Sequence, residues 1–143
     1  MLAGKFLFQF CFAMRLLSWN CQGAGKALTA RALKALVSEN SPDIVFLSET
    51  KSDVKKIEKI RLSLNFVDCL CVEAFGKAGG LALFWRKGVE LEVVYSDNQI
   101  IAALIYSDPP DSTWLLLTIR GPHEQRFRKR FWANHERFDI ILL

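Results

Sequence analysis

Two apolar runs of strand length constrain the fold of this chain more than any other feature. They span 15–20 and 43–49, and each delivers a polar side chain at its C-terminal end, Asn20 from the first and Glu49 from the second. Between them, apolar residues recur at helical spacing over 27–40. Strand, helix and strand in this order predict a βαβ unit with parallel strands. Active sites in open α/β sheets collect where such strands end, so we expect Asn20 and Glu49 to lie at a functional edge.

Each predicted helix has one apolar face that we expect to be buried. In the helix over 27–40, the apolar positions at helical spacing are Leu28, Ala32, Leu33, Leu36 and Val37. Pro42 ends this helix, because proline disfavours a helical residue before it. A second helix is predicted to run from a cap at Ser52 to about Leu64, and its inner face carries Val54, Ile57, Ile60 and Leu64.

After residue 64 the pattern changes to short β-rich runs that are separated by turn signals. We expect an antiparallel meander with strands within 66–75, 80–85, 89–96, 100–107 and 113–119. The glycine-rich loop 76–80 is interpreted as a hairpin turn, because it lacks the strand and helix that flank a nucleotide-binding loop. A basic, aromatic helix is expected from Glu124 to about Phe138. These elements predict a mixed α/β layered structure.

Length and composition indicate one folded domain. The chain has 143 residues, of which 51% are hydrophobic and 24% charged, which is typical of a globular protein rather than a disordered one. The formal net charge is +4. A mildly basic chain of this kind is compatible with a polyanionic partner but does not require one.

Residues 1–13 differ from the rest of the chain. The segment 6–13 follows Lys5 and has the outline of a signal-peptide core, but Gln9 interrupts it and no cleavage site of small residues follows. It is also far too short to span a bilayer. We interpret 1–13 as an N-terminal extension and expect the domain itself to occupy 14–143. No other segment is a candidate for a membrane span, so we expect no stable membrane partner.

The four cysteines are Cys11, Cys21, Cys69 and Cys71. Cys69 and Cys71 are two residues apart in an alternating apolar segment, so they should face the same side of a strand. No second pair follows at zinc-ligand spacing, and neither His123 nor His135 completes a zinc-finger pattern. We favour free buried thiols, in a reducing compartment, over a metal site or a disulfide.

Glu49 and Asn20 each have two interpretations. A carboxylate at the end of a buried strand is costly unless it is paired or bound to a metal, so Glu49 is a candidate ligand for Mg²⁺, or for Mn²⁺ in its place. Alternatively, Glu49 is exposed, begins the loop and pairs with Lys51. The amide of Asn20 suits the orientation of a phosphate oxygen and a metal-bound water. Alternatively, it starts an Asx turn into the loop 23–25.

The run 120–130 is basic and contains interleaved aromatic residues. Such a run can follow a phosphate backbone. The candidate contacts are Arg120, Arg126, Arg128, Lys129 and Arg130. The alternative is a solvated helix face whose aromatic residues, Phe127, Phe131 and Trp132, pack inward.

Taken together, these segments resemble the endonuclease/exonuclease/phosphatase superfamily, which has the DNase I and AP-endonuclease fold. The resemblance covers 14–138 and is carried by the segments 14–23, 42–51, 79–85 and 95–98. Its closest likeness is to the nuclease domain of plant non-LTR (LINE-type) retroelements. It implies a layered α/β sandwich of the DNase I-like type and a Mg²⁺-dependent endonuclease with DNA as its partner. By the same resemblance, Glu49 binds the metal, and Asn20 orients the metal site and the scissile phosphate. The sequence leaves the location within the cell open, and a nuclear site follows only from the presumed DNA substrate.

The chain departs from this resemblance in two ways. Members usually carry a tyrosine where Arg120 stands, and a guanidinium does not reproduce the geometry or proton chemistry of a phenol. The second half of the family's domain supplies an aspartate–asparagine strand and an aspartate–histidine pair, which position and activate the attacking water. The sequence to Leu143 has no counterpart of them. We therefore expect a domain truncated to roughly its first half, with little or no activity alone.

A truncated sandwich would expose the inner face of its sheet. Such an apolar face promotes self-association or binds a complementary protein half. Two other functions therefore remain open beside the endonuclease. One is a non-catalytic fragment that binds nucleic acid or protein through the basic helix. The other is a small-molecule phosphatase of the same superfamily, which the retroelement-like strands disfavour.

Overall fold

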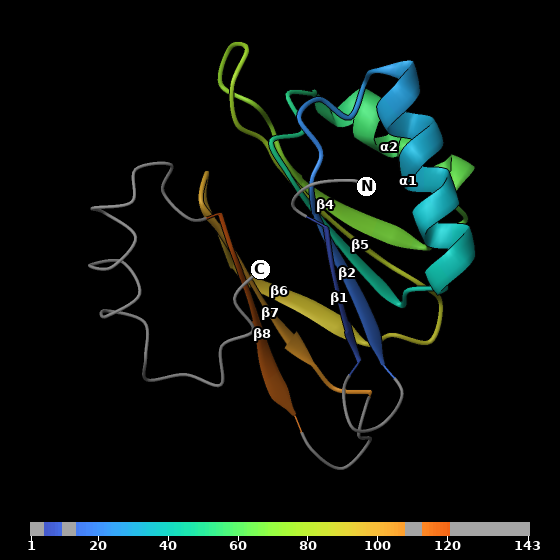
Figure 1. Cartoon of the computed structure of the whole chain (residues 1–143). Coiled ribbons are helices and arrows are strands. Elements are labelled where there is room, and N and C mark those ends of the chain that lie inside the picture. The colour runs from blue at the N-terminus through green and yellow to red at the C-terminus, as the bar shows by residue number, and fades with distance from the viewer. Residues whose placement is uncertain (1–4, 10–13, 108–112, 121–143) are drawn as a thin grey trace.

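The computed structural model describes residues 5–9, 14–107 and 113–120, and these residues form three layers (Figure 1). Within these ranges, two helices cover one face of a five-stranded sheet and a three-stranded sheet packs on the other face. The predicted α/β layered sandwich is therefore confirmed. In the described part of the chain, no helix is both long enough and apolar enough to cross a membrane.

The larger sheet has the strand order β1-β2-β3-β5-β4. Its strands are β1 (Lys5–Gln9), β2 (Arg15–Asn20), β3 (Ile44–Ser48), β4 (Asp68–Val72) and β5 (Leu81–Trp85). The parallel pair β2 and β3 is connected through helix α1 (Ala27–Asn40), and helix α2 (Val54–Ser63) connects β3 to β4. The other pairs in this sheet are antiparallel. The predicted βαβ unit is thus present.

The smaller sheet is antiparallel and has the order β6-β7-β8. Its strands are β6 (Leu91–Ser96), β7 (Ile100–Ile105) and β8 (Trp114–Ile119). The predicted basic helix over 124–138 lies outside the described residues.

Strand β1 lies within the segment that the sequence analysis assigned to an N-terminal extension. It pairs antiparallel with β2, with Leu7 opposite Leu17, and forms one edge of the larger sheet. The boundary near residue 14 stays a prediction. The residues before it nevertheless add a strand to the sheet.

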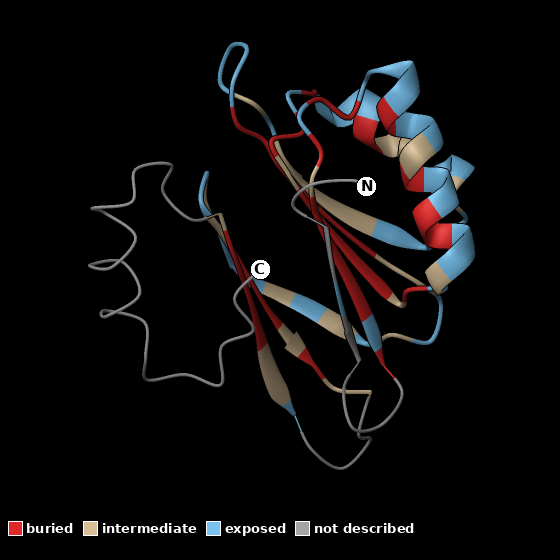
Figure 2. Cartoon of the chain, viewed as in Figure 1, coloured by how far each residue is buried: buried red, intermediate tan, exposed pale blue. Residues whose placement is uncertain are grey.

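The central strands of the larger sheet are buried on both faces (Figure 2). Leu17 and Val45 face the helices, whereas Leu16 and Ile44 face the smaller sheet. All four are fully buried. The near-continuous hydrophobicity of 43–49 predicted this burial, because a strand covered on both sides has no polar face.

The five predicted strands are present, and β4–β5 and β6–β7–β8 pair antiparallel as predicted, but they do not form one continuous meander. Strand β5 lies between β3 and β4, and the chain leaves the larger sheet after β5, so that β6 to β8 form a separate sheet. Leu81 to Phe84 are fully buried, which suits β5 to a central position. Strand β6 is partly buried only at Leu91 and Val93 and is otherwise exposed, as expected at an edge. Alternation predicts a strand but does not identify its neighbours.

The predicted exposure of the inner sheet face is also wrong. The smaller sheet packs against Phe46 and Leu83 of the larger sheet. The packing residues are Ile101 and Ile105 of β7 and Leu116 of β8, and all five side chains are almost completely buried. The two sheets therefore cover each other. Self-association through an exposed inner face has no support in the described residues.

The helices bury narrower faces than predicted. In α1, Leu33, Leu36 and Val37 are buried, but Leu28 in the first turn is 78% exposed. In α2, Ile57 is fully buried and Val54 is exposed. A first-turn position lies at the end of the helix, where an apolar residue can extend past the sheet beneath it.

The predicted cap of the second helix is wrong by one residue. The Asp53 side chain accepts a hydrogen bond from Lys56 N–H at 2.9 Å and caps α2. The Ser52 hydroxyl instead donates to Thr50 O at 2.8 Å. Serine and aspartate both suit this role, so the sequence alone does not separate two adjacent candidates.

Candidate functional site

Asn20 and Glu49 reach the same edge of the larger sheet. Asn20 ends β2 and lies opposite Ser48, the last residue of β3, and Glu49 follows directly. Because β2 and β3 are parallel, both side chains leave the sheet at its C-terminal edge. Both predicted strands therefore end at the same edge of the sheet, as the sequence predicts.

The backbone of Glu49 is held between two loops. Gly23 N–H donates to Glu49 O at 2.8 Å on one side, and Thr50 N–H donates to Gly80 O at 3.2 Å on the other. Glu49 has a φ of +54°, in the left-handed region that a non-glycine residue seldom adopts. Such a conformation persists only where its surroundings fix it. The loop after β2 and the start of β5 provide that fixation.

The carboxylate of Glu49 is buried and carries an ion pair. The residue is only 4% exposed. Its Oε2 accepts a hydrogen bond from Gly79 N–H at 3.2 Å, and its Oε1 pairs with Nη2 of Arg120. The interpretation of Glu49 as an exposed residue paired with Lys51 is therefore wrong. Sequence reasoning identified both Glu49 and Arg120, but it assigned Arg120 to phosphate and missed this contact.

Arg120 brings the smaller sheet into the site. It directly follows β8, and its backbone N–H donates to Gln99 O at 2.7 Å. Its ion pair with Glu49 therefore connects the two sheets at their shared edge. No sequence spacing signals this contact, because the two residues meet only when the sheets pack.

Two glycines with positive φ lie beside this arrangement, and only the second of them, Gly80, lacks room for a Cβ. Gly79 has a φ of +77°, and a Cβ placed on it would lie 3.4 Å from Nη1 of Arg120. Gly80 has a φ of +92°, and a Cβ there would lie 2.3 Å from Oγ1 of Thr50. The second distance is far below any normal contact. The hairpin turn predicted for 76–80 thus also forms one wall of the site.

The Asn20 side chain contacts its own loop. It is half-buried, and its Oδ1 accepts a hydrogen bond from Nε2 of Gln22 at 3.1 Å. The acceptor thus binds a side-chain amide, whereas the Asx-turn interpretation requires a backbone N–H. Gln22, which sequence reasoning did not single out, is a further polar residue of this edge.

The residues of this edge do not fit a divalent ion as they are arranged. Asn20 and Glu49 carry the oxygen ligands that Mg²⁺ prefers. Of these two residues, only Glu49 supplies a carboxylate, and the guanidinium of Arg120 already lies against it. That positive charge repels a metal cation at the same place. Within the described ranges, no group of three or more His, Cys, Asp or Glu residues could hold a metal.

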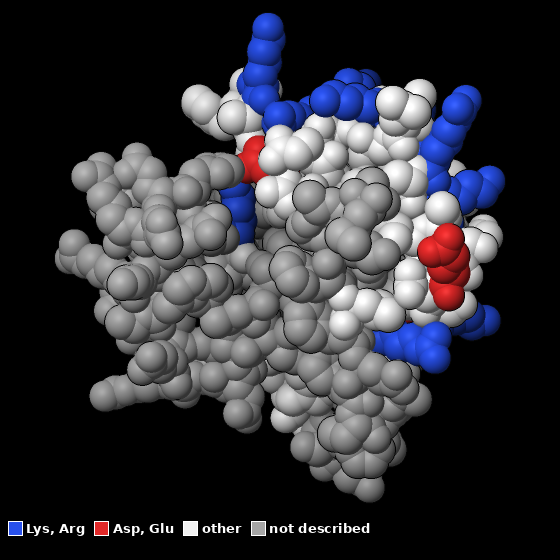
Figure 3. Space-filling view, viewed as in Figure 1, with Lys and Arg blue, Asp and Glu red and all other residues white. Residues whose placement is uncertain are grey.

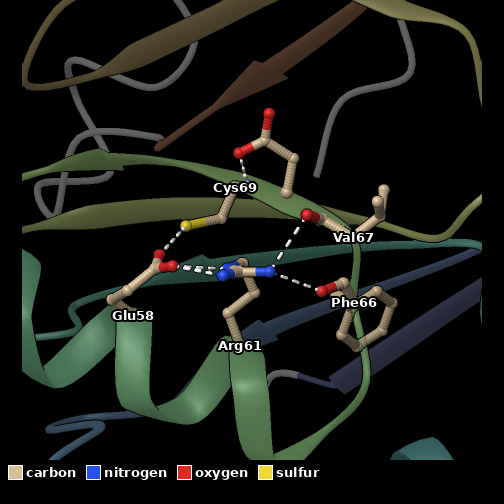
Figure 4. A network of polar contacts seen from close by, with 6 residues as sticks. Glu58, Arg61, Phe66, Val67 and Cys69 are labelled. Carbon is tan, nitrogen blue, oxygen red and sulfur yellow. Dashed lines mark hydrogen bonds and ion pairs between the residues drawn. The ribbon is translucent and has the colours of Figure 1, made fainter.

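The cysteines of the described residues are free thiols, as predicted, but only Cys21 is fully buried, whereas Cys69 and Cys71 are half-buried. Burial raises the pKa of Cys21 to about 11, of Cys71 to about 11 and of Cys69 to about 12. The Cys69 thiol also donates to Oε2 of Glu58 at 3.4 Å (Figure 4). All three are therefore protonated at neutral pH and unsuited to act as nucleophiles. Cys11 lies outside the described residues.

The basic run is only partly visible, since Arg126, Arg128, Lys129 and Arg130 lie outside the described residues. Other basic side chains gather along the upper edge of the described part (Figure 3). The loops and helix starts around Glu49 carry four exposed lysines: Lys26, Lys51, Lys56 and Lys77. These lysines make the rim of the site positive.

Comparison with known proteins identifies relatives of this fold. Residues 17–142 match the model of the Endonuclease/Exonuclease/phosphatase family. No curated protein matches the sequence.

Three solved structures illustrate the likeness, each with a TM-score of 0.56. The 3' phosphatase NExo from Neisseria, bound to product DNA hairpin, is 19% identical, with 92% of this chain and 56% of that one covered. For an AP endonuclease from Archaeoglobus fulgidus, the identity is 14% and the coverage 84% and 48%. For a humanized TDP2 from D. rerio, the identity is 16% and the coverage 85% and 58%. The chain thus spans about half the length of these proteins, and at such identities the likeness shows the fold alone.

Proposed function

The chain belongs to the endonuclease/exonuclease/phosphatase family, and from this premise we propose that it supplies the Glu49-bearing part of a phosphodiesterase that acts on DNA. Members of this family generally depend on a divalent metal. For this chain we propose Mg²⁺, with Mn²⁺ as a substitute, and an origin in a plant LINE-type retroelement. A nuclear location follows from the proposed substrate.

The observation that carries this proposal is the placement of Glu49. The fold keeps a carboxylate 4% exposed at the C-terminal edge of parallel strands, in a left-handed backbone conformation. Surface glutamates are easily accommodated in water, whereas this arrangement is costly to maintain. A cost of this kind is typical of functional sites. In the proposed role, Asn20 helps to orient the phosphate at the same edge.

DNA is the partner that the comparisons favour. One of the similar structures is described as bound to a DNA hairpin, and another as an AP endonuclease. The exposed lysines around Glu49 suit a phosphate backbone. The alternative of a small-molecule phosphatase has no comparable support, because the 3' phosphatase among these structures is described as bound to a DNA hairpin.

We propose that the chain alone hydrolyses DNA weakly or not at all. Arg120 neutralises Glu49, so the described edge offers no free carboxylate to a metal ion. The experiment is nicking of supercoiled plasmid in Mg²⁺ and in Mn²⁺ by the wild type, Glu49→Gln and Glu39→Gln. Glu39 is an exposed acid on α1 and serves as the matched control.

We expect slow nicking at most, lost in Glu49→Gln and retained in Glu39→Gln. Nicking that Glu49→Gln leaves unchanged would contradict the role of Glu49. Rapid nicking by the wild type that Glu49→Gln abolishes would support the role of Glu49 and contradict the proposal that the chain alone has little activity.

The second candidate is non-catalytic binding of nucleic acid. It is favoured by the four exposed lysines of the rim together with a neutralised Glu49. Binding through these cations should weaken steeply with salt, because phosphate contacts release counterions. Titration of a DNA duplex at several salt concentrations tests this. An affinity that is independent of salt, or that depends on Glu49, would exclude this candidate.

A further inference from the structure

We propose that Arg120 is a built-in competitor for the divalent metal of this site. Its guanidinium neutralises the Glu49 carboxylate in place of an ion, and a metal binds Glu49 only when Arg120 leaves it. This inference rests on the proposed function, because it concerns the same carboxylate. It makes Arg120 the residue that sets the metal affinity of the site.

The ion pair is enclosed, which gives it strength. The side chain of Glu49 is 5% exposed and that of Arg120 is 22% exposed. Exposed ion pairs are weakened by water and salt, whereas enclosed pairs are screened much less. Separation of this pair would leave a buried carboxylate without its counter-charge. An incoming metal has to offset that cost.

Both partners are held in place by the fold. The Arg120 backbone is hydrogen-bonded to Gln99 and follows the fully buried Ile119. Gly79 lies against the guanidinium, with its Cβ position 3.4 Å from Nη1 of Arg120, and donates its N–H to Glu49. The pair is therefore a fixed part of the edge rather than a chance contact between long surface side chains.

The charges give the expected direction of the effect. A guanidinium and a divalent ion beside one carboxylate repel each other, so each weakens the binding of the other to Glu49. Removal of the charge at position 120 should therefore strengthen metal binding. Replacement by another cation should leave it weak.

The experiment measures Mn²⁺ binding to the purified chain from the electron paramagnetic resonance signal of the free ion. Arg120→Gln removes the charge but keeps an amide donor for Glu49, and Arg120→Lys is the matched control that keeps the charge. We expect Arg120→Gln to bind Mn²⁺ at least about tenfold more tightly than the wild type. We expect Arg120→Lys to stay within about threefold of the wild type. The double variant Glu49→Gln/Arg120→Gln should lose the gain.

A thermal melt keeps the test decisive if Arg120→Gln is unstable. In EDTA, Arg120→Gln should melt below the wild type, and Mn²⁺ should raise its Tm more than that of the wild type. Equal Mn²⁺ affinity and equal Mn²⁺-dependent Tm shifts in the two proteins would overturn the proposal. A variant that stays unfolded in saturating Mn²⁺ would also overturn it, because the ion should then neutralise Glu49.

The outcomes separate this inference from the proposed function. Tighter Mn²⁺ binding by Arg120→Gln, together with nicking that Glu49→Gln leaves unchanged, supports the inference and contradicts the role of Glu49 in a phosphodiesterase. Nicking that depends on Glu49, with Mn²⁺ affinity unchanged by Arg120→Gln, supports the phosphodiesterase and contradicts the inference.

Discussion

Two arginine–glutamate ion pairs in this molecule form in opposite ways. Glu58 and Arg61 form their ion pair within α2, three residues apart (Figure 4), and the Glu58 side chain is 43% exposed. Glu49 and Arg120 come from different sheets, and the Glu49 side chain is 5% exposed. An isolated helix could form the first pair, since residues three apart share a helix face. The second pair exists only when both sheets have packed.

This difference shows that the Glu49–Arg120 pair depends on the tertiary fold, whereas the Glu58–Arg61 pair does not. Arg61 also donates to Phe66 O and Val67 O, at 2.8 and 3.0 Å, so it supports the chain as it leaves α2. Its hydrogen bond to Glu58 lowers the pKa of that carboxyl. Water reaches this pair and weakens it. The enclosed Glu49–Arg120 pair should therefore dominate the ionic contribution to stability.

The largest effect is expected from Arg120→Leu, which leaves the Glu49 carboxylate buried without its counter-charge. We expect the free energy of unfolding to fall by about 3–5 kcal/mol in metal-free buffer. Urea unfolding followed by circular dichroism measures it. Lys87→Leu, at an exposed turn, is the control and should change stability by less than about 0.5 kcal/mol. A loss below about 1 kcal/mol in Arg120→Leu would mean that the pair contributes little.

Two glycine substitutions compare the site with a peripheral turn. Gly80→Ala combines a φ of +92° with a Cβ 2.3 Å from Thr50 Oγ1, and should destabilise the fold by about 2–4 kcal/mol. Gly88→Ala has a φ of +98° but nothing within 4 Å, so only backbone strain of about 1–2 kcal/mol is expected. The same unfolding assay applies. Equal losses in the two variants would show that the site wall is not tightly packed.

The cysteines place one thiol beside each ion pair. Cys21 donates to Ser48 O at 3.5 Å and to Glu49 O at 3.8 Å, whereas Cys69 donates to Glu58. Burial raises the pKa of Cys21 to about 11 and that of Cys69 to about 12, from 9.0 in the unfolded chain.

A thiol with a raised folded pKa contributes stability that is present below pH 9 and is lost as the pH rises toward 11 or 12. We therefore expect the unfolding free energy to decline from pH 9 upward, and less steeply in Cys21→Ala. Urea titrations at pH 8 and pH 10.5 test this. An identical pH slope in Cys21→Ala would refute the contribution of Cys21.

The smallest effect is expected at the exposed pair. Glu58→Gln should lower Tm by no more than about 3 °C at pH 7, because water already screens the charge. The lowered pKa of Glu58 means that its contribution is present at neutral pH and is lost as the pH falls below about 4.5. Thermal melts at pH 7 and pH 3.5 should therefore show a larger difference between the wild type and Glu58→Gln at pH 7 than at pH 3.5. If Glu58→Gln lowered Tm more than Glu49→Gln does, the exposed pair would contribute more to stability than the enclosed pair.

Sequence reasoning predicted the parts of this fold that depend on local pattern. The strands ending at Asn20 and before Glu49, the helix 27–40 and the free thiols follow from periodicity, proline and cysteine spacing. The position of β5 does not, because fully apolar residues such as Leu81 to Phe84 fit beside any buried strand. Only the packed sheets determine which neighbour a central strand takes.

The site was predictable in its residues and not in its contacts. Glu49 and Arg120 stood out because a carboxylate ends an apolar run and an arginine replaces an expected tyrosine. Their ion pair and the Gly79 N–H are long-range contacts that carry no sequence spacing. The cap of α2 was likewise not predictable from the sequence, because Ser52 and Asp53 are adjacent and either side chain can cap a helix; the structure uses Asp53.

The central claim is that Glu49 and Arg120 stabilise each other, and a double-mutant cycle measures this most directly. The unfolding free energies of the wild type, Glu49→Gln, Arg120→Leu and the double variant are compared in EDTA. We predict a coupling free energy of about 2 kcal/mol or more between the two positions. Additive losses, with a coupling below about 0.5 kcal/mol, would contradict the account.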